Sequence, residues 1–187
     1  MLPGEPLRPG KIYNSNLYVL AGRLQELGFE PEVLGILPDD AEQAAAFIAG
    51  WRKKVDLFLT TGGVSVGKKD IMHEVVRRIG TRLFWRVCIK PGAPVIAYTA
   101  GDMLGIALSG NPFASYATFE LLTRPVLAAL AGRSDVAYPR QRASSPTRSR
   151  SRATGVASSA RTMRRASFRF LRSTTRVRCF PQPAAMP

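Results

Sequence analysis

The sequence has few of the residues that cross-link a chain or bind transition metals, with one histidine and two cysteines in 187 residues. Cys88 lies in an apolar run and Cys179 in a basic segment, and neither has CxxC or Cys/His spacing around it. This pattern argues against a disulfide framework and against a structural zinc site. The single histidine, His73, falls inside a predicted helix, so a mechanism with a histidine general base has little support.

Long apolar runs and a signal peptide are also missing. No apolar run approaches the roughly 20 residues that span a bilayer. The start, Met1–Pro6, lacks the basic stretch followed by an apolar stretch that is typical of a signal peptide. We therefore expect a cytoplasmic protein that makes no membrane contact.

Lysine and glutamate are missing from the last part of the chain. Residues 133–187 contain 13 arginines, no lysine and one acidic residue, whereas residues 1–132 carry 14 Lys and Arg against 12 Asp and Glu. The formal net charge of +14 is therefore concentrated in the tail. Because the tail also has no sustained hydrophobic period, we predict that residues 133–187 are a disordered basic tail.

Two interpretations of this tail remain open. An Arg- and Ser-rich segment is typical of nucleic-acid binding through phosphate contacts. Alternatively, the segment is the product of a reading-frame shift, because GC-rich codons read out of frame yield Arg, Ser, Pro and Ala. The complete absence of lysine beside 13 arginines favours the second interpretation.

What the chain does contain, from Lys11 to Gly132, is an alternation of short apolar runs and amphipathic segments. This pattern predicts an α/β domain with a mainly parallel sheet over residues 11–132, and residues 1–10, rich in Pro and Gly, are expected to be a linker or the end of an upstream domain. Helices are expected to begin near the cap residues Asn14–Asn16, Asp39–Asp40, Asp70 and Asn111–Pro112, the last with a kink at Pro125. Strands are expected over residues 32–37, 56–60, 83–89, 95–98 and 104–108.

The strongest local signal is a glycine-rich segment that follows a buried strand and precedes a helix, Thr61–Gly67. Such a turn leaves backbone N–H groups unpaired at the carboxyl end of the sheet, where anions bind. Gly62, Gly63 and Gly67 allow close approach of a phosphate, and the hydroxyls of Thr61 and Ser65 add donors. The spacing matches neither a Walker A loop nor a dinucleotide fingerprint, and a tight structural turn is the alternative.

Two further corners have a similar build. Ser109-Gly110-Asn111-Pro112 follows the last predicted strand, and Lys90-Pro91-Gly92 places a point charge between two strands. Because strand ends of one mainly parallel sheet share an edge, we expect the three corners to form one pocket.

Six segments in order resemble the molybdopterin molybdotransferases, the MoeA and gephyrin E-domain family. They are Pro9–Asn16, Gly35–Asp40, Thr61–Gly67, Phe84–Trp85, Ile89–Gly92 and Ser109–Pro112. The resemblance covers about residues 3–132 and implies the three-layer α/β/α fold that this family's central domain shares with molybdopterin adenylyltransferases (MoaB/Mog-like). It also implies a homodimer and a molybdopterin adenylyltransferase as partner.

The activity that the resemblance implies is Mg²⁺-dependent insertion of molybdate into adenylylated molybdopterin with release of AMP. Asp70 and Lys90 would be catalytic, and Asp70, Asp39 and Asp40 would bind Mg²⁺. The substrate would be held by Thr61, Gly62, Gly63, Ser65, Gly67, Lys90, Pro91, Gly92, Ser109, Gly110, Asn111 and Pro112. Each has a structural alternative, a helix cap for the three aspartates and a solvated charge for Lys90. Arg86 is either a second cation in the pocket or a surface ion pair.

Four positions depart from the family's usual residues. Asn14 stands where Asp is usual, Ala93 where Lys is usual, Ser109 where Pro is usual and Ala114 where Ser is usual, although Ser115 lies beside the last. Since the family's members carry further domains, we expect a truncated and impaired molybdotransferase. A non-catalytic molybdopterin-binding module and a nucleic-acid-binding protein that acts through its tail are the alternatives.

Overall fold

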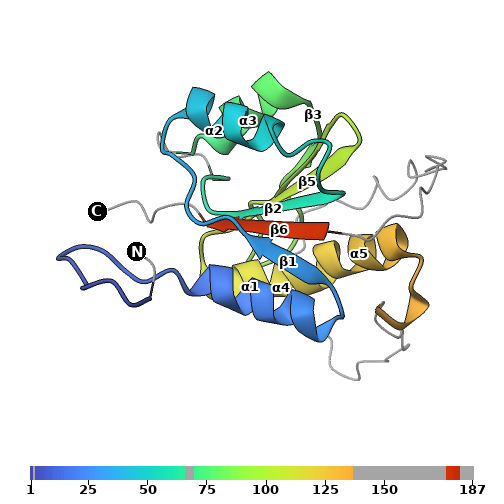
Figure 1. Cartoon of the computed structure of the whole chain (residues 1–187), viewed down its shortest axis with the longest axis horizontal. Coiled ribbons are helices and arrows are strands. Elements are labelled where there is room, and N and C mark those ends of the chain that lie inside the picture. Colours follow the sequence, from blue (N-terminus) through green and yellow to red (C-terminus); the bar gives the residue numbers. More distant parts are fainter. Residues whose placement is uncertain (2, 66–69, 137–175, 182–187) are drawn as a thin grey trace, which may run out of the picture. The chain divides into compact units, whose positions relative to one another are not determined.

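The protein is an α/β unit in which helices cover both faces of one sheet (Figure 1). The computed structural model describes residues 1, 3–65, 70–136 and 176–181, the last six by their backbone alone. The helices are α1 (Ser15–Glu26), α2 (Ala41–Ala49), α3 (Met72–Ile79), α4 (Pro112–Thr118) and α5 (Arg124–Ala131), with a π-helical turn (Phe119–Thr123) and a short 3₁₀ turn (Ser134–Val136). The strands are β1 (Glu30–Val33), β2 (Leu57–Thr61), β3 (Thr81–Trp85), β4 (Ile96–Ala100), β5 (Met103–Leu108) and β6 (Arg176–Pro181).

The sheet has the strand order β1-β6-β2-β5-β4-β3. Strands β1, β6, β2 and β5 run parallel, while β4 and β3 are antiparallel to their neighbours. The mainly parallel sheet expected from the alternating pattern is confirmed, as are the three layers. β2 is buried along its whole length, as a central strand with helices on both faces must be.

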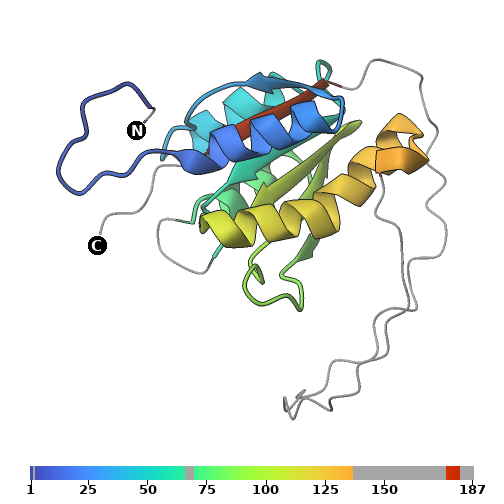
Figure 2. The ribbon, with the colours of Figure 1, turned by 90° about the horizontal axis from the view of Figure 1, so that it is seen from below.

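Two apolar clusters fill the space between the layers. One lies between the sheet and the pair α2 and α3, and includes Phe58, Tyr98 and Met72. The other lies between the sheet and the layer of α1, α4 and α5, and includes Leu24 and Phe119. Figure 2 shows α1 beside the continuous run of α4 and α5 on the same face. The clusters are the apolar faces expected from the helical periodicity.

Three of the four predicted helix starts have the expected cap residue, whereas α3 begins at Met72, later than the start predicted at Asp70, and its cap residue Ile71 makes no side-chain cap hydrogen bond. Asn14, Asp40 and Asn111 are the N-caps of α1, α2 and α4, and each side chain accepts a hydrogen bond from a backbone N–H in the first turn. The kink expected at Pro125 takes the form of the π-helical turn before it. A proline has no N–H to donate to the preceding turn, and a wider turn accommodates this loss.

The described domain continues past the predicted boundary at Gly132. Gly132 has φ of 63° and ends α5 as a left-handed cap. Arg133 then donates to the carbonyl of Leu27 (2.9 Å), and Val136 is buried. Residues 133–136 thus belong to the folded unit.

β6 is a strand that we did not predict. It lies within the segment expected to have no regular structure and pairs in parallel with both β1 and β2. The sequence Arg-Val-Arg-Cys-Phe alternates with period 2 over too few residues to stand out in a basic tail. The prediction of disorder is therefore corrected for residues 176–181, and the remainder of the tail from residue 137 lies outside the described residues.

The N-terminal segment folds back on itself. The Met1 ammonium group donates to the carbonyl of Ile12 (3.0 Å), and the Tyr13 hydroxyl donates to the carbonyl of Glu5 (2.8 Å). The Asn14 N–H donates to the carbonyl of Met1 (2.8 Å). Residues 1–10, predicted as a linker, are thus tied at several points to the start of the first helix. Within the described residues, no helix is both long and apolar enough to cross a bilayer.

Candidate functional site

Two glycine corners meet at the carboxyl edge of the sheet. Thr61 and Leu108 are paired as the last residues of β2 and β5, and the Gly62 N–H donates to the carbonyl of Leu108 (2.8 Å). A Cβ built on Gly110 would lie 3.5 Å from the Cα of Gly62. The convergence of these corners, expected from their positions after parallel strands, is therefore present in the structure.

The first corner turns because its glycines adopt a left-handed conformation. Gly62 and Gly63 have φ values of 86° and 65°, which any other residue adopts only at a cost. The carbonyl of Gly63 accepts a hydrogen bond from the N–H of Met72 at the start of α3 (3.2 Å). Val64 is buried and Ser65 is exposed. The corner is thus anchored to α3 and β5 while its surface remains open.

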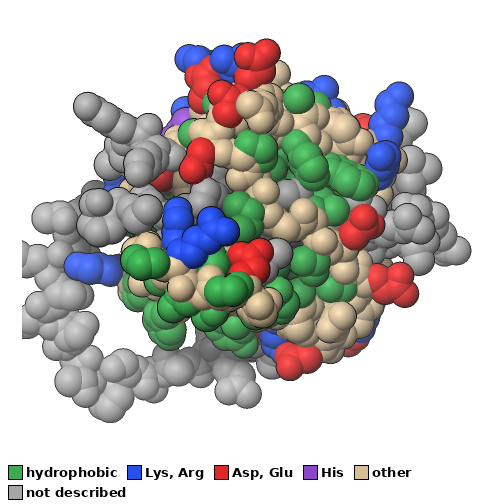
Figure 3. Space-filling model, turned by 60° about the vertical axis from the view of Figure 1, so that its left-hand side comes forward, with side chains coloured by type: hydrophobic (Ala, Val, Ile, Leu, Met, Phe, Trp, Pro, Cys, Tyr) green, Lys and Arg blue, Asp and Glu red, His purple; other side chains and the backbone are tan. Residues whose placement is uncertain are grey.

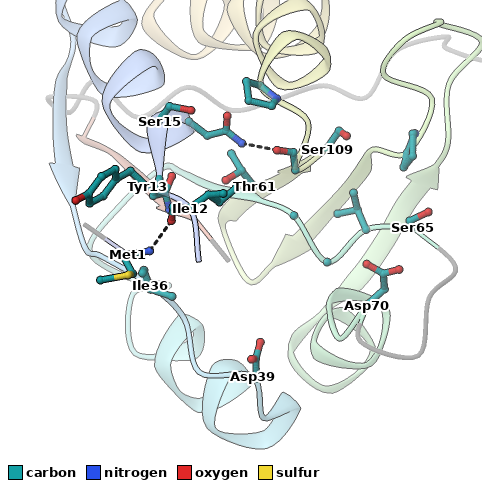
Figure 4. Close-up of a pocket in the computed structure, with 18 of the residues that line it drawn as sticks. Met1, Ile12, Tyr13, Ser15, Ile36, Asp39, Thr61, Ser65, Asp70 and Ser109 are labelled. Atoms are coloured by element: carbon teal, nitrogen blue, oxygen red, sulfur yellow. Dashed lines mark hydrogen bonds between the residues drawn. The ribbon is translucent and has the colours of Figure 1, made fainter. Parts of the chain in front are cut away.

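A cavity of about 430 Å³ lies over these corners (Figure 4). Its floor includes the hydroxyl residues Thr61 and Ser109, and the carboxylates of Asp39 and Asp70 lie on the side of α2 and α3. Residues from the N-terminal segment, among them Ile12 and Tyr13, form the opposite wall. The cavity therefore offers hydrogen-bond donors at its base, acidic groups on one side and apolar groups on the other.

Most of the predicted site residues lie together in this cavity. The predicted site residues among those that line it are Asp39, Thr61, Gly62, Gly63, Ser65, Asp70, Ser109, Gly110 and Pro112. Asn111 is the N-cap of α4, and the backbone N–H of Asn111 donates a hydrogen bond to the hydroxyl of Ser109 (3.3 Å). Gly67 lies outside the described residues.

The third corner reaches the same edge, but its lysine is not on the wall of the cavity. Because β4 runs antiparallel to β5, the segment between β3 and β4 lies beside the end of β5. Pro94 lines the cavity, whereas Lys90 is exposed and is not a lining residue. A Cβ on Gly92, next to Pro91, would lie 2.6 Å from Cγ2 of Thr118, so this corner packs against α4.

The three aspartates predicted as metal ligands are divided between two roles. Asp40 caps α2 by accepting a hydrogen bond from the N–H of Gln43 (2.8 Å), which is the helix-cap role given above as the alternative to metal binding. Asp39 and Asp70 line the cavity. Among the described residues there is no group of three or more His, Cys, Asp and Glu side chains that could hold a metal ion. Mg²⁺ is commonly held by one or two carboxylates together with substrate phosphates, so Asp39 and Asp70 are the acidic residues of the cavity that could hold it.

Several residues at the cavity were not assigned a role from the sequence. Lys11, in the N-terminal segment, lines the cavity and places a positive charge on its wall, whereas Lys90 is not a lining residue. Asn16, also a lining residue, is 9% exposed and donates from Nδ2 to the carbonyl of Gly110 (2.9 Å), which ties α1 to the second corner. Lys11 precedes α1, and Asn16 lies in its first turn. From the sequence, the run Asn14-Ser15-Asn16 predicted only the start of a helix.

The departures from the family pattern have different consequences. Asn14 caps α1, as an aspartate could, and Ser109 adds a hydroxyl to the cavity. Ala114 is buried, and Ser115, the suggested substitute, is 1% exposed and does not line the cavity. Arg86 is exposed and lies over the ring of Trp85, with Cζ 5.6 Å from the ring centroid, rather than in the cavity.

Charges on this side of the molecule are mixed. On the face that Figure 3 shows, the described residues present small groups of basic, acidic and apolar side chains, without a continuous basic field. A ligand at this edge would therefore meet local donors and acceptors, whereas binding to nucleic acid depends on extended basic surface.

Comparison with known proteins agrees with this geometry. Residues 2–129 match a family described as "Probable molybdopterin binding domain". The chain belongs to this family. The resemblance to molybdopterin molybdotransferases is confirmed by relatives named molybdopterin molybdenumtransferase. One from Bacillus subtilis is 40% identical over 66% of this chain and 29% of its own length, and one from Haemophilus influenzae is 39% identical over 69% of this chain and 32% of its own length.

The fold of this molybdopterin-binding domain is also found in a solved structure. The crystal structure of a molybdopterin biosynthesis MoeA protein from Pyrococcus horikosii has a TM-score of 0.63 and 30% sequence identity, over 71% of this chain and 33% of that one. The chain thus spans about a third of the length of the relatives it matches.

Proposed function

We propose that this domain binds adenylylated molybdopterin in the cavity at the carboxyl edge of the sheet and is the substrate-binding part of a molybdopterin molybdotransferase. The proposal is supported above all by the contact between the corners after β2 and β5, which places glycine backbone and two hydroxyls at the base of one cavity. Backbone N–H groups and hydroxyls are suitable donors for phosphate oxygens.

The side chains around the base divide into two groups. Thr61 and Ser109 would donate hydrogen bonds to phosphate or molybdate oxygens, and Lys11 would add a positive charge. Lys90, predicted as the catalytic cation, is exposed and does not line the cavity, so its role in catalysis stays a prediction. Asp70 and Asp39 would hold Mg²⁺, which, when bound, would neutralise charge on the adenylyl phosphate.

Binding is tested by titration calorimetry with adenylylated molybdopterin. We expect Gly110→Val to weaken binding at least about tenfold, the loss of one good hydrogen bond to a charged group, because its side chain would enter the space between the corners. Gly22→Ala on α1 is the matched control, since a Cβ there meets nothing within 4 Å. Equal affinity of Gly110→Val and the wild type would overturn the assignment of the cavity.

Chemistry is tested separately by measuring AMP release after molybdate and Mg²⁺ are added. If Asp70 serves the reaction, Asp70→Asn abolishes release, whereas Asp102→Asn, on the exposed turn between β4 and β5, leaves it unchanged. Tight binding by the wild type without any release would select the alternative, a non-catalytic molybdopterin-binding module.

A homodimer, contact with a molybdopterin adenylyltransferase and a cytoplasmic location are proposed by analogy with the family. Nucleic-acid binding by residues 133–187 stays a prediction, because most of that segment lies outside the described residues. A nucleic-acid affinity of the full chain that falls steeply with rising salt concentration would support it.

A further inference from the structure

Three consecutive carbonyl groups in the first glycine corner are each held by a donor. The carbonyl of Gly63 accepts from the Met72 N–H (3.2 Å), and that of Val64 accepts from Nε1 of Trp85 (3.1 Å). The carbonyl of Ser65 lies 3.2 Å from Nε2 of His73. Two of the three donors are side chains, which come from β3 and α3.

The two side chains also support each other. The rings of His73 and Trp85 meet edge to face, with centroids 4.6 Å apart and an interplanar angle of 87°. Nη1 of Arg82 lies 3.5 Å from Nδ1 of His73. Since a backbone carbonyl can only accept, Nε2 of His73 donates to Ser65, while Nδ1 faces the guanidinium of Arg82.

These contacts fix the direction of the loop's N–H groups. The C=O and N–H of a trans peptide unit point in opposite directions. With the Gly63 carbonyl held by α3 and the Val64 carbonyl held by Trp85, the N–H groups of Val64 and Ser65 point away from α3 and β3. Val64 and Ser65 line the cavity, whereas Trp85 packs against the core between the sheet and the pair α2 and α3 and is not a lining residue.

We propose that Trp85 and His73 are positioning residues that hold Val64 and Ser65 of the first corner, so that the N–H groups of these two residues face the anionic part of the ligand. This inference rests on the proposed function for the identity of the ligand, but the peptide orientation does not depend on it. Held in advance, the donors bind an anion without a cost for reorganisation.

The first test separates the Nε1 donor of Trp85 from the bulk of its ring. Trp85→Phe keeps an aromatic ring against His73 and the core but removes the hydrogen bond to Val64. We expect affinity for adenylylated molybdopterin to fall about tenfold, the effect of losing one hydrogen bond to a charged group, while the melting temperature changes little. Trp51→Phe is the matched control, because Trp51 lies in the turn after α2 and is also partly buried against the same core but does not line the cavity; this variant should bind as the wild type does.

His73 is tested by loss and rescue. His73→Leu removes the donor to Ser65 and is expected to weaken binding about tenfold in the same way. His73→Gln places an amide N–H at a similar distance along the side chain and should restore most of the affinity. A purely packing role for His73 predicts the opposite order, with the apolar leucine better than glutamine.

Amide NMR spectra of the ligand-free protein test the peptide orientation independently of the proposed pterin ligand. In amide NMR spectra, Trp85→Phe should shift or broaden the Ser65 N–H signal, because the Val64–Ser65 peptide unit loses its anchor, and should leave Gly110 unaffected. An unchanged Ser65 signal, or unchanged affinity in a wild type that binds the pterin, overturns the positioning role. Absence of binding by the wild type, with the Ser65 signal altered in the variant, overturns the proposed ligand and leaves the peptide orientation supported.

Discussion

At the scale of single residues, Gly105 lacks a side chain because the ring of Tyr98 occupies the space. The two residues are paired across β4 and β5, and a Cβ on Gly105 would lie 2.0 Å from Cζ of Tyr98. We expect Gly105→Ala to destabilise the domain by about 3 kcal/mol, as overpacking of a rigid core does. Gly22 lies in the middle of α1, where a Cβ would meet nothing within 4 Å. Because alanine favours the helix more than glycine does, Gly22→Ala should instead stabilise the domain by up to about 1 kcal/mol. Urea denaturation of the two variants measures both effects, and similar stabilities would contradict this account.

Tyr98 also makes the stability of the folded domain depend on pH. Its side chain is completely buried, and this burial raises the pKa of Tyr98 above the ordinary value near 10. Above pH 10 the unfolded chain releases this proton and the folded one retains it, so the stability falls by about 1.4 kcal/mol for each further pH unit. Below pH 10 this contribution is constant.

The variant Tyr98→Phe should remove this fall. It should also match or exceed the wild type at neutral pH, since the Tyr98 hydroxyl has no hydrogen-bond partner among the described residues. The measurement is the difference in unfolding free energy between the variant and the wild type from pH 8 to pH 11. A difference that stays constant across this range would exclude a retained proton on Tyr98.

Residues with local roles could be predicted from the sequence, while those with distant partners could not. Asn14, Asp40 and Asn111 cap helices as expected, because a cap depends on the next three residues alone. Asn16 reaches Gly110, which is 94 positions away, and no local pattern indicates this. Lys11 and Lys90 show the same limit, because only the folded chain places one on the cavity wall and the other outside it.

At the scale of elements, a buried acid joins α1 to the long helical run over the same face of the sheet. Glu120, in the π-helical turn, is 6% exposed and binds Nε of Arg23 (2.5 Å) and Nη1 of Arg124 (3.2 Å). The hydrogen bond with Glu120 is the largest cause of a raised pKa of Arg23, and a second hydrogen bond, from Nη1 of Arg23 to Glu26 (2.8 Å), raises it further. Because both arginines are partly withdrawn from water, removing the acid leaves two cations without their shared partner.

We expect Glu120→Gln to lower the free energy of unfolding by about 3 kcal/mol, the lower end of the cost of breaking a buried ion pair. Glu26→Gln is the matched control, since Glu26 pairs with the same arginine but is 67% exposed, and its loss should cost less than about 1 kcal/mol. Thermal or urea unfolding of the two variants provides the comparison. Equal losses would show that the pair with Glu120 is no more important than a surface ion pair.

The order of the elements, but not all of their boundaries, followed from the sequence. The strand expected over residues 32–37 lies at Glu30–Val33, and that expected over residues 83–89 lies at Thr81–Trp85. In both cases an apolar run continues into a loop whose residues pack against the clusters, as Leu37 and Val87 do. Burial without strand geometry gives the same hydrophobic pattern as a strand, so the pattern alone does not fix where a strand ends.

At the scale of the whole molecule, the sheet depends on a strand from the far end of the chain. β6 separates β1 from β2 and supplies backbone partners to both. Without it, the edge strand β1 would have no partner in the sheet, and β2 would have one unpaired edge. The domain outlined from its motifs, residues 11–132, would therefore be incomplete at this position.

Two truncated chains test this dependence. A chain that ends at Ala137 lacks β6, whereas one that ends at Pro181 retains it. We expect the first to lose at least about 2 kcal/mol of stability, since each hydrogen bond of the ladder contributes about 1 kcal/mol, and the second to match the full chain. Hydrogen exchange should accelerate at the β1 and β2 amides in the shorter chain and remain slow at β5. If the tail is instead an out-of-frame product without a structural role, both truncated chains would have the stability and exchange pattern of the full chain.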